Sequence, residues 1–175
     1  MRMAVKTWFA LTSRNKASLR IRKSLDKYLA LAGLTNAECG ALSVLVPPMP
    51  GIDDDMRDWS FFMILEHNAI VNRSITSVIT SLVRGEEPTG AGAIDPKKDV
   101  MPSEGSGVEQ IEAFRASVED HLEVVSSLDR LRGSRCKRHS VFGEFDAHGW
   151  HCMFRFHLLI HYKQAAYVVR KACAE

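Results

Sequence analysis

Residues 150–168, WHCMFRFHLLIHYKQAAYV, decide the fold. Apolar and aromatic side chains recur there every three or four residues, which is the period of a helix with one buried face. The stripe consists of Trp150, Met153, Phe154, His157, Ile160, His161, Gln164 and Val168. A helix that begins near Asp146 and runs towards the C-terminus is therefore predicted, with imidazoles on the face that points into the core.

Three more segments have helical period, at about residues 13–33, 61–84 and 106–133. Ser60 is a suitable N-cap for the second, and Ser106 with Glu109 has the spacing of a capping box for the third. Thr35 and Glu38 have the same spacing and predict a short additional helix. No segment shows strand period, so the predicted fold class is all-α, a four-helix bundle that forms one domain.

Two long connectors separate the predicted helices. Residues 46–57 are rich in proline and acidic side chains, and residues 85–107 are rich in glycine and proline. The second connector is long enough to travel the length of a bundle, so the second and third helices are expected to run parallel. Both loops are the expected walls of any pocket.

The bulk composition is that of an average globular protein. A chain of 175 residues with 46% apolar and 25% charged residues can enclose a hydrophobic core, which excludes disordered and fibrous classes. The net charge of +2 gives no reason to expect nucleic acid or an anionic membrane as partner. The basic stretch 2–27 is interpreted as a solvated helix face, and nucleic-acid binding through the first helix is ranked last because that helix has no recognisable binding motif.

The cysteines Cys39, Cys136, Cys152 and Cys173 form no C-x-x-C pair and have neither zinc-ribbon nor disulfide-framework spacing. Cys152 and Cys173 fall in the last helix, where a reduced thiol packs as a small apolar residue. No apolar run reaches the length of a membrane span, and the N-terminus is too weakly apolar for a signal peptide. These features predict a soluble protein with free thiols in the reducing cytoplasm.

His157 and His161 form an H-x-x-x-H pair, which places both rings on one face of the helix about 6 Å apart along its axis. His67 lies on the apolar stripe of the second helix in the same way. An unsatisfied buried polar group costs on the order of 1–3 kcal/mol, and one metal ion would satisfy all three imidazoles. Packed histidines without a metal are the competing interpretation. H-E-x-x-H is absent, so a metalloprotease is not predicted.

Three protein ligands leave coordination positions open, as in a catalytic metal site. Neutral imidazole binds zinc, nickel, iron and copper; zinc or nickel is expected here, with iron or manganese as alternatives. Gln164, one turn beyond His161, is a candidate to orient a ligand from the second shell. Affinity for the metal is expected to fall as the pH drops through about 6.5, because each ligating imidazole must be neutral.

The other histidines are weaker candidates. His121 borders the stripe of the third helix and His139 precedes the fourth, so both are possible site-lining residues; simple packing for His121 and a loop-fixing hydrogen bond for His139 are the alternatives. His148 and His151 are expected on the solvent side of the fourth helix. Glu66 is rotated about 100° from its neighbour His67 and is not expected to be a general base.

Several motifs together carry a resemblance to a known family. They are WS at 59–60, LEH at 65–67, NR at 72–73, HSVFG at 139–143, Trp150 and FHLLIHYKQ at 156–164. With them, most of the chain resembles the DinB/YfiT-like superfamily of metal-binding helical bundles. The resemblance implies up-down-down-up connectivity and a metal held by His67, His157 and His161. Ser140, where members commonly have proline, and the acidic run 53–55 depart from the family pattern.

The resemblance implies a metal-dependent enzyme, either a hydrolase or a thiol-dependent S-transferase. Its substrate would be a small molecule, and its co-substrate a low-molecular-weight thiol such as bacillithiol, mycothiol or glutathione. The alternative is a non-catalytic bundle of the same fold. Such a protein would be a metal-binding stress protein or an interaction module, and exposed faces of the first or third helix are its candidate surfaces for a homodimer.

Overall fold

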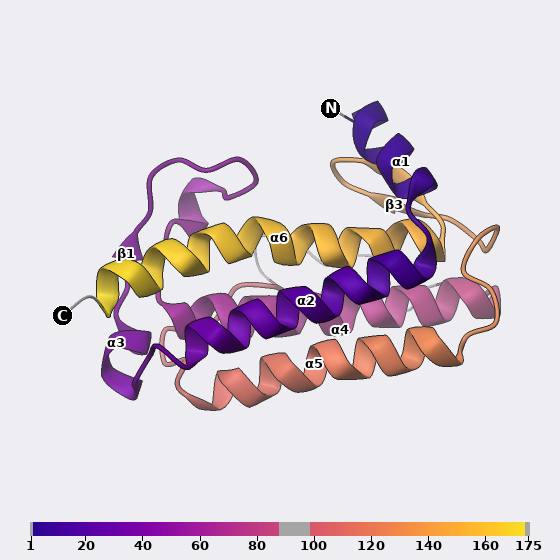
Figure 1. The fold of residues 1–175 in the computed structure, drawn as a ribbon. Coiled ribbons are helices and arrows are strands. Elements are labelled where there is room, and N and C mark those ends of the chain that lie inside the picture. Colours follow the sequence, from indigo (N-terminus) through magenta and orange to yellow (C-terminus); the bar gives the residue numbers. More distant parts are fainter. Residues whose placement is uncertain (1, 88–98, 174–175) are drawn as a thin grey trace.

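Four long helices lie side by side in the computed structural model, which describes residues 2–87 and 99–173 (Figure 1). They are α2 (Arg14–Ala32), α4 (Phe61–Arg84), α5 (Glu109–Ser127) and α6 (Ala147–Ala172). Helices α4 and α5 run in one direction, whereas α2 and α6 run in the other, as the colour gradient along each ribbon shows (Figure 1). Helix α4 packs mainly against α5 and α6, and α2 packs mainly against α6. Along the chain the four directions are therefore up, down, down and up, which confirms the predicted four-helix bundle and its connectivity.

Three predicted helix starts are confirmed by their capping bonds. The side chains of Ser13, Ser60 and Asp146 each accept a hydrogen bond from the backbone N–H three residues later, at 3.2, 3.2 and 2.8 Å respectively. Such bonds satisfy one of the free N–H groups at a helix start. Helix α4 ends before Gly85, whose φ of 72° lies in the left-handed region that glycine adopts at little cost.

The third predicted helix differs from the structure at both ends. Helix α5 begins at Glu109, and the predicted capping box of Ser106 and Glu109 is absent, because the Glu109 carboxylate accepts from the Gly107 N–H at 2.9 Å instead of from the Ser106 N–H. Ser106 does not cap the helix, because its hydroxyl contacts the Glu66 carboxylate and the Ser103 carbonyl instead. The helix stops at Ser127 rather than near residue 133. Part of the predicted 85–107 connector, residues 88–98, lies outside the described residues.

Short elements flank the bundle. They are α1 (Arg2–Leu11), α3 (Ala37–Ala41), β1 (Val44–Leu45), the 3₁₀ helix η1 (Asp54–Met56), β2 (Asp58–Trp59), β3 (Lys137–His139) and β4 (Gly143–Phe145). Strands β1 and β2 pair antiparallel, as do β3 and β4. Strands of two or three residues are too short for a period to be read from the sequence, and they leave the all-α class unchanged. Helix α3 is capped by Asn36 rather than by Thr35.

One contiguous apolar cluster fills the bundle, and all four long helices contribute to it. Tyr28 of α2, Phe62 of α4, Phe114 of α5 and Phe154 of α6 are almost completely buried. Full burial of a side chain such as phenylalanine stabilises a fold by roughly 1.5–3 kcal/mol. The Tyr28 hydroxyl is not left unpaired, since it donates to the carbonyl of Leu158 at 3.0 Å.

The two longest helices, α4 with 24 residues and α6 with 26, have the length that a membrane span requires. Their sequences are interrupted by polar and charged side chains. Within residues 2–87 and 99–173, no helix is both long and apolar enough to cross a membrane.

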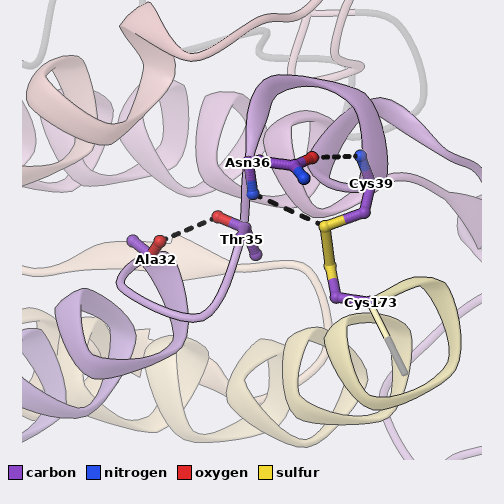
Figure 2. Close-up of a disulfide and its surroundings, with 5 residues drawn as sticks. All are labelled: Ala32, Thr35, Asn36, Cys39 and Cys173. Atoms are coloured by element: carbon purple, nitrogen blue, oxygen red, sulfur yellow. Dashed lines mark hydrogen bonds between the residues drawn. A yellow bond between two sulfur atoms is a disulfide. The ribbon is translucent and has the colours of Figure 1, made fainter. Parts of the chain in front are cut away.

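A disulfide joins Cys39 of α3 to Cys173 at the end of α6 (Figure 2). The two Cα atoms are 5.3 Å apart, although 134 positions separate the residues in sequence. The prediction of a reduced Cys173 is therefore wrong, because the fold brings α3 and the end of α6 together in a way that spacing does not reveal. The cysteine-based argument for a reducing compartment loses its support. Cys136 is exposed and Cys152 is buried, and both are free thiols.

Candidate metal centre

Three histidines from two helices converge between α4 and α6. The ring centroids of His67 and His157 are 5.1 Å apart, those of His67 and His161 are 4.6 Å apart, and those of His157 and His161 are 4.5 Å apart. One ring nitrogen from each residue lies within 4.8 Å of the other two. The structure thus brings together the three residues that the sequence singles out, although 90 positions separate His67 from His157.

His67 is held by a backbone carbonyl outside the bundle. Its Nδ1 lies 2.7 Å from the carbonyl oxygen of Val100, and a carbonyl oxygen only accepts hydrogen bonds. Nδ1 must therefore carry the proton, and in the neutral ring Nε2 keeps its lone pair. That Nε2 lies 3.2 Å from Nε2 of His157.

His161 is oriented in the same way by Gln164. The side-chain nitrogen of Gln164 donates to the carbonyl of Met56 at 2.6 Å, so its amide oxygen is the atom that faces His161 at 2.9 Å. Nδ1 of His161 donates to that oxygen, which leaves its Nε2 with a free lone pair. Gln164 therefore orients the ring of His161 and also ties it to the loop before α4.

His157 is the more accessible member of the cluster. Its side chain is partly exposed, whereas His67 and His161 are each only 2% exposed. Its Nδ1 has no hydrogen-bond partner within the described part of the chain. This Nδ1 atom is itself buried, although the residue as a whole is partly exposed.

Burial lowers the pKa of all three imidazoles. The pKa of His161 falls to about 3, mainly because burial penalises the charged ring. The pKa of His157 falls well below its usual value through burial first, and then through repulsion from the neighbouring imidazoles of His161, His67 and His139. All three rings are consequently neutral near pH 7, which is the state in which histidine binds metal ions.

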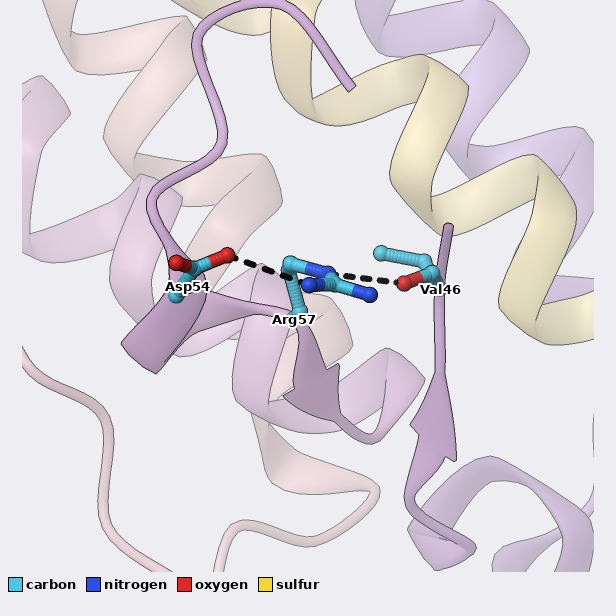
Figure 3. A network of polar contacts seen from close by, with 3 residues as sticks. All are labelled: Val46, Asp54 and Arg57. Atoms are coloured by element: carbon cyan, nitrogen blue, oxygen red, sulfur yellow. Dashed lines mark hydrogen bonds and ion pairs between the residues drawn. The ribbon is translucent and has the colours of Figure 1, made fainter. Parts of the chain in front are cut away.

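Trp59 covers one side of the cluster. Its ring centroid is 5.0 Å from that of His67 and 6.3 Å from that of His161, and the second pair is stacked at 16°. Trp59 is the last residue of strand β2, and Arg57, which precedes that strand, anchors it. The Arg57 guanidinium donates to the Val46 carbonyl at 2.9 Å and pairs with Asp54 at 3.0 Å (Figure 3). Trp59 and the strand β2 that carries it therefore cover this side of the cluster.

The segment that carries Val100 is held by Glu66. The Glu66 carboxylate accepts hydrogen bonds from the Ser103 N–H at 2.8 Å, from the Ser103 hydroxyl at 3.0 Å and from the Ser106 hydroxyl. These bonds fix residues 100–106 next to the N-terminal half of α4. Glu66 points to this segment and not into the cluster, in agreement with the prediction that it is no general base.

The two candidate site-lining histidines have different positions. His139 contacts the rings of Phe142 and Trp150, and it is near enough to His157 to lower the pKa of that ring. Its Nδ1 accepts from the Val141 N–H at 3.1 Å, which is the loop-fixing bond considered as the alternative. His121 lies away from the cluster and stacks on Phe154 at a centroid distance of 3.7 Å.

His148 and His151 are buried, so the prediction that they face solvent is wrong. Helix α1 and the start of α2 cover the first turns of α6. Nε2 of His148 lies 3.2 Å from the carbonyl oxygen of Phe9 and 2.9 Å from that of Thr12. His151 contacts Ser18 of α2. Helix α1 was not predicted, and the burial of His148 depends on it.

Fold and site together define a class: a four-helix bundle with a cluster of three neutral histidines between its second and fourth helices. Among solved structures, the chain is similar to the crystal structure of TT2238, a four-helix bundle protein, with a TM-score of 0.54 and 21% sequence identity. The match covers 88% of this chain and 98% of the other. No family model and no curated protein match the sequence. The similarity supports the fold.

Proposed function

We propose that His67, His157 and His161 together bind one divalent transition-metal ion. The observation that carries the proposal is the approach of Nε2 of His67 to Nε2 of His157 at 3.2 Å. Nε2 of His67 is an acceptor because its Nδ1 is committed to Val100, and Nε2 of His161 is an acceptor because its Nδ1 is committed to Gln164. In the metal-free protein the Nε2–H of His157 donates to Nε2 of His67, and a cation would take the place of that proton and bind one nitrogen of each ring.

The donor set fits such an ion. Zinc–nitrogen bonds of about 2.0–2.1 Å hold tetrahedral ligand atoms roughly 3.3 Å apart. The pair His67–His157 already has this separation, at 3.2 Å. All three nitrogens lie within 4.8 Å of one another, so a ring movement on the order of 1 Å completes the set. Imidazole ligands favour zinc or nickel, with iron or manganese as alternatives.

We further propose that the protein is a metal-dependent enzyme of the DinB/YfiT-like type, a hydrolase or a thiol-dependent S-transferase acting on a small molecule. A divalent ion with three protein ligands supplies Lewis-acid activation of a water or thiol at its open positions. The residues of the chain supply the remainder: Trp59 excludes water from one side, and Val100 and Gln164 fix the ligating tautomers. Substrate would approach from the side of His157, the most exposed of the three histidines.

Elemental analysis of the purified protein tests the metal site. We expect about one metal ion per chain, and loss of that ion from His157→Ala with the helical circular dichroism unchanged. His139→Ala is the matched control, because His139 borders the site without joining the ligand set, and it should keep the metal. Retention of stoichiometric metal by His157→Ala would reject the site.

The enzymatic part is tested separately with the protein carrying its native metal. A screen of small electrophiles with bacillithiol, mycothiol or glutathione should reveal thiol transfer, and the same electrophiles without thiol should reveal hydrolysis. Either activity should vanish in His157→Ala. Stoichiometric metal without turnover in both screens would favour the non-catalytic metal-binding bundle.

A further inference from the structure

Two arginines meet where α1, α2 and α6 pack together. Helices α2 and α6 run in the same direction (Figure 1), and Nζ of Lys27 on α2 lies 5.5 Å from the ring centroid of Tyr162 on α6. Seven residues before this contact, which is about two turns on each helix, α2 carries Arg20 and α6 carries Arg155. Burial lowers the pKa of Arg155, and the charge of Arg20 lowers it further. The two guanidinium groups are therefore neighbours across one seam.

The guanidinium of Arg155 has a hydrogen-bond donor that the chain does not use. Its Nη1 is buried and has no partner within the described residues. The ring of Trp8 on α1 lies over the group, with its centroid 4.9 Å from Cζ, and packs edge-on against Phe156. An aromatic face attracts a cation, but it supplies no anionic oxygen to the N–H groups. Because arginine cannot lose its proton in a protein, Arg155 keeps both its charge and this unused donor.

No carboxylate on the three helices neutralises the pair. Helices α1 and α6 contain no aspartate or glutamate. The single acidic residue of α2 is Asp26, six residues after Arg20 and rotated about 240° from it around the helix. Asp146, which caps α6, already accepts two backbone N–H bonds. Neither arginine forms an ion pair with another described residue. The Cys152 thiol, which lies near both, is neutral, because burial raises its pKa to about 12.

The arginine pair is accessible from solvent. Arg20, Arg155 and Trp8 are each partly exposed. Lys16 and Lys23 lie four residues before and three residues after Arg20, at exposed positions on the same face of α2. Their charges add to the positive potential around the pair, which favours the approach of an anion.

We propose that Arg20 and Arg155 bind a phosphate group, either as free phosphate or on a small phosphorylated molecule, with Trp8 as the cover of the site. Each planar guanidinium can donate two parallel hydrogen bonds to phosphate oxygens. A phosphate monoester carries a charge of about −1.5 to −2 near pH 7, which matches two arginines, whereas a carboxylate carries one charge. The Trp8 ring moves aside when a phosphate oxygen reaches Nη1 of Arg155. Arg155 is rotated about 200° from His157 around α6, so this site and the three-histidine cluster lie on different sides of that helix.

Tryptophan fluorescence of the full-length protein tests the site, because a bound phosphate changes the surroundings of Trp8. Titration with phenyl phosphate should give a saturable change, and benzoate, which has the same ring and one charge, should bind more weakly. Treatment with a chelator should leave the titration unaltered, since phosphate bound to a metal ion would be lost with the ion. Trp8→Phe should lose most of the fluorescence change and still bind phenyl phosphate in calorimetry.

Variants of the arginines test the two ligands. Arg20→Gln should weaken binding of phenyl phosphate about tenfold, because it removes one charge and its donors. Arg155→Lys keeps the charge but loses the planar fork, and it should also weaken binding. Arg22→Gln is the matched control: Arg22 is exposed on the same helix but is rotated about 200° from Arg20. At about 0.15 M salt, where separated surface charges are screened, it should bind like the unaltered protein.

Inorganic phosphate distinguishes the two sources of the group. Tighter binding of phenyl phosphate would support a phosphorylated molecule, and equal or tighter binding of inorganic phosphate would support the free ion. Equal losses in Arg20→Gln and Arg22→Gln would mean general attraction to a basic surface and would overturn the proposal. A single-stranded oligonucleotide that binds more tightly than both compounds, and loses its binding in Arg20→Gln, would overturn the assignment to a small ligand. Absence of saturable binding of both compounds by the unaltered protein would also overturn it.

Discussion

Gln164 donates its side-chain amide to the backbone carbonyl of Met56 over 2.6 Å, and this bond decides which end of the amide faces His161. Because the nitrogen is engaged with Met56, the oxygen faces Nδ1 of His161 at 2.9 Å. The loop before α4 thereby selects the tautomer of a histidine on α6. The three-histidine cluster between two helices thus depends on a backbone atom that belongs to neither helix.

Gln164→Leu is expected to weaken metal binding by about 10- to 100-fold, because the ring of His161 loses the partner that fixes its proton and orientation. Isothermal titration of the metal-free protein with zinc measures the change. Gln110→Leu on α5, which applies the same substitution away from the cluster, should bind like the unaltered protein. Equal affinities in the two variants would mean that Gln164 does not orient the ligand.

Glu66→Ala is expected to weaken metal binding about tenfold, although Glu66 touches no ligand. The carboxylate fixes Ser103 and Ser106, and hence the Val100 carbonyl that holds His67. Zinc titration gives the affinity, and circular dichroism checks that the helices persist. Glu119→Ala, an exposed position on α5, serves as the comparison. If both variants bind equally tightly, the 100–106 segment does not position His67.

The long helices were predictable because each has many apolar positions at one period. The stripe at 150–168 and the capping residues Ser13, Ser60 and Asp146 carry enough local signal to fix three helix starts. The convergence of His67 with the H-x-x-x-H pair was also predictable, because all three imidazoles lie on helix faces that point into the same core. The contact between Gln164 and His161 was predictable because the two residues lie about one helical turn apart.

The parts that the sequence did not predict depend on backbone atoms or on distant contacts. The carbonyl of Val100 holds His67, and that of Met56 holds Gln164 against His161. Every residue has a backbone carbonyl, so the residue type does not reveal which one makes such a bond. The burial of His151 depends on a contact with α2, and that of His148 on α1. The pairing of Cys39 with Cys173 depends on the ends of two helices meeting across 134 positions.

The depressed pKa values change the pH at which metal should be lost. The reference value of about 6.5 predicts weakening just below neutral pH, because protons compete with the metal for imidazole nitrogens. Burial holds the pKa of His161 at about 3 and lowers those of His67 and His157. Zinc affinity should therefore stay nearly constant through 6.5 and fall only at lower pH. Titrations at a series of pH values decide this, and a midpoint at 6.5 would show that the rings are not buried before the metal binds.

Removal of the disulfide is expected to lower the free energy of unfolding by roughly 2–5 kcal/mol, because the bond restricts a long loop in the unfolded chain. Urea unfolding of Cys39→Ser, Cys173→Ser and the double variant measures the loss. All three should lose about the same amount, since either single change breaks the same bond. Cys136→Ser removes an exposed free thiol and should change little. Additive losses in the double variant would show that the two residues act separately.

The stability of the metal-free protein should fall as the pH drops below about 6.5. His121 and His151 are buried and neutral, with the pKa of His151 lowered to about 4. In the unfolded chain each would take up a proton near 6.5, so between these values the unfolded state binds more protons and is favoured as the pH falls. Each histidine can contribute at most about 1.4 kcal/mol per pH unit to the slope. Urea unfolding at about pH 7, 6 and 5 measures it. His121→Phe removes one titrating group and should flatten the slope, whereas a slope equal to that of the unaltered protein would mean that His121 is already protonated, or exposed, in the folded state.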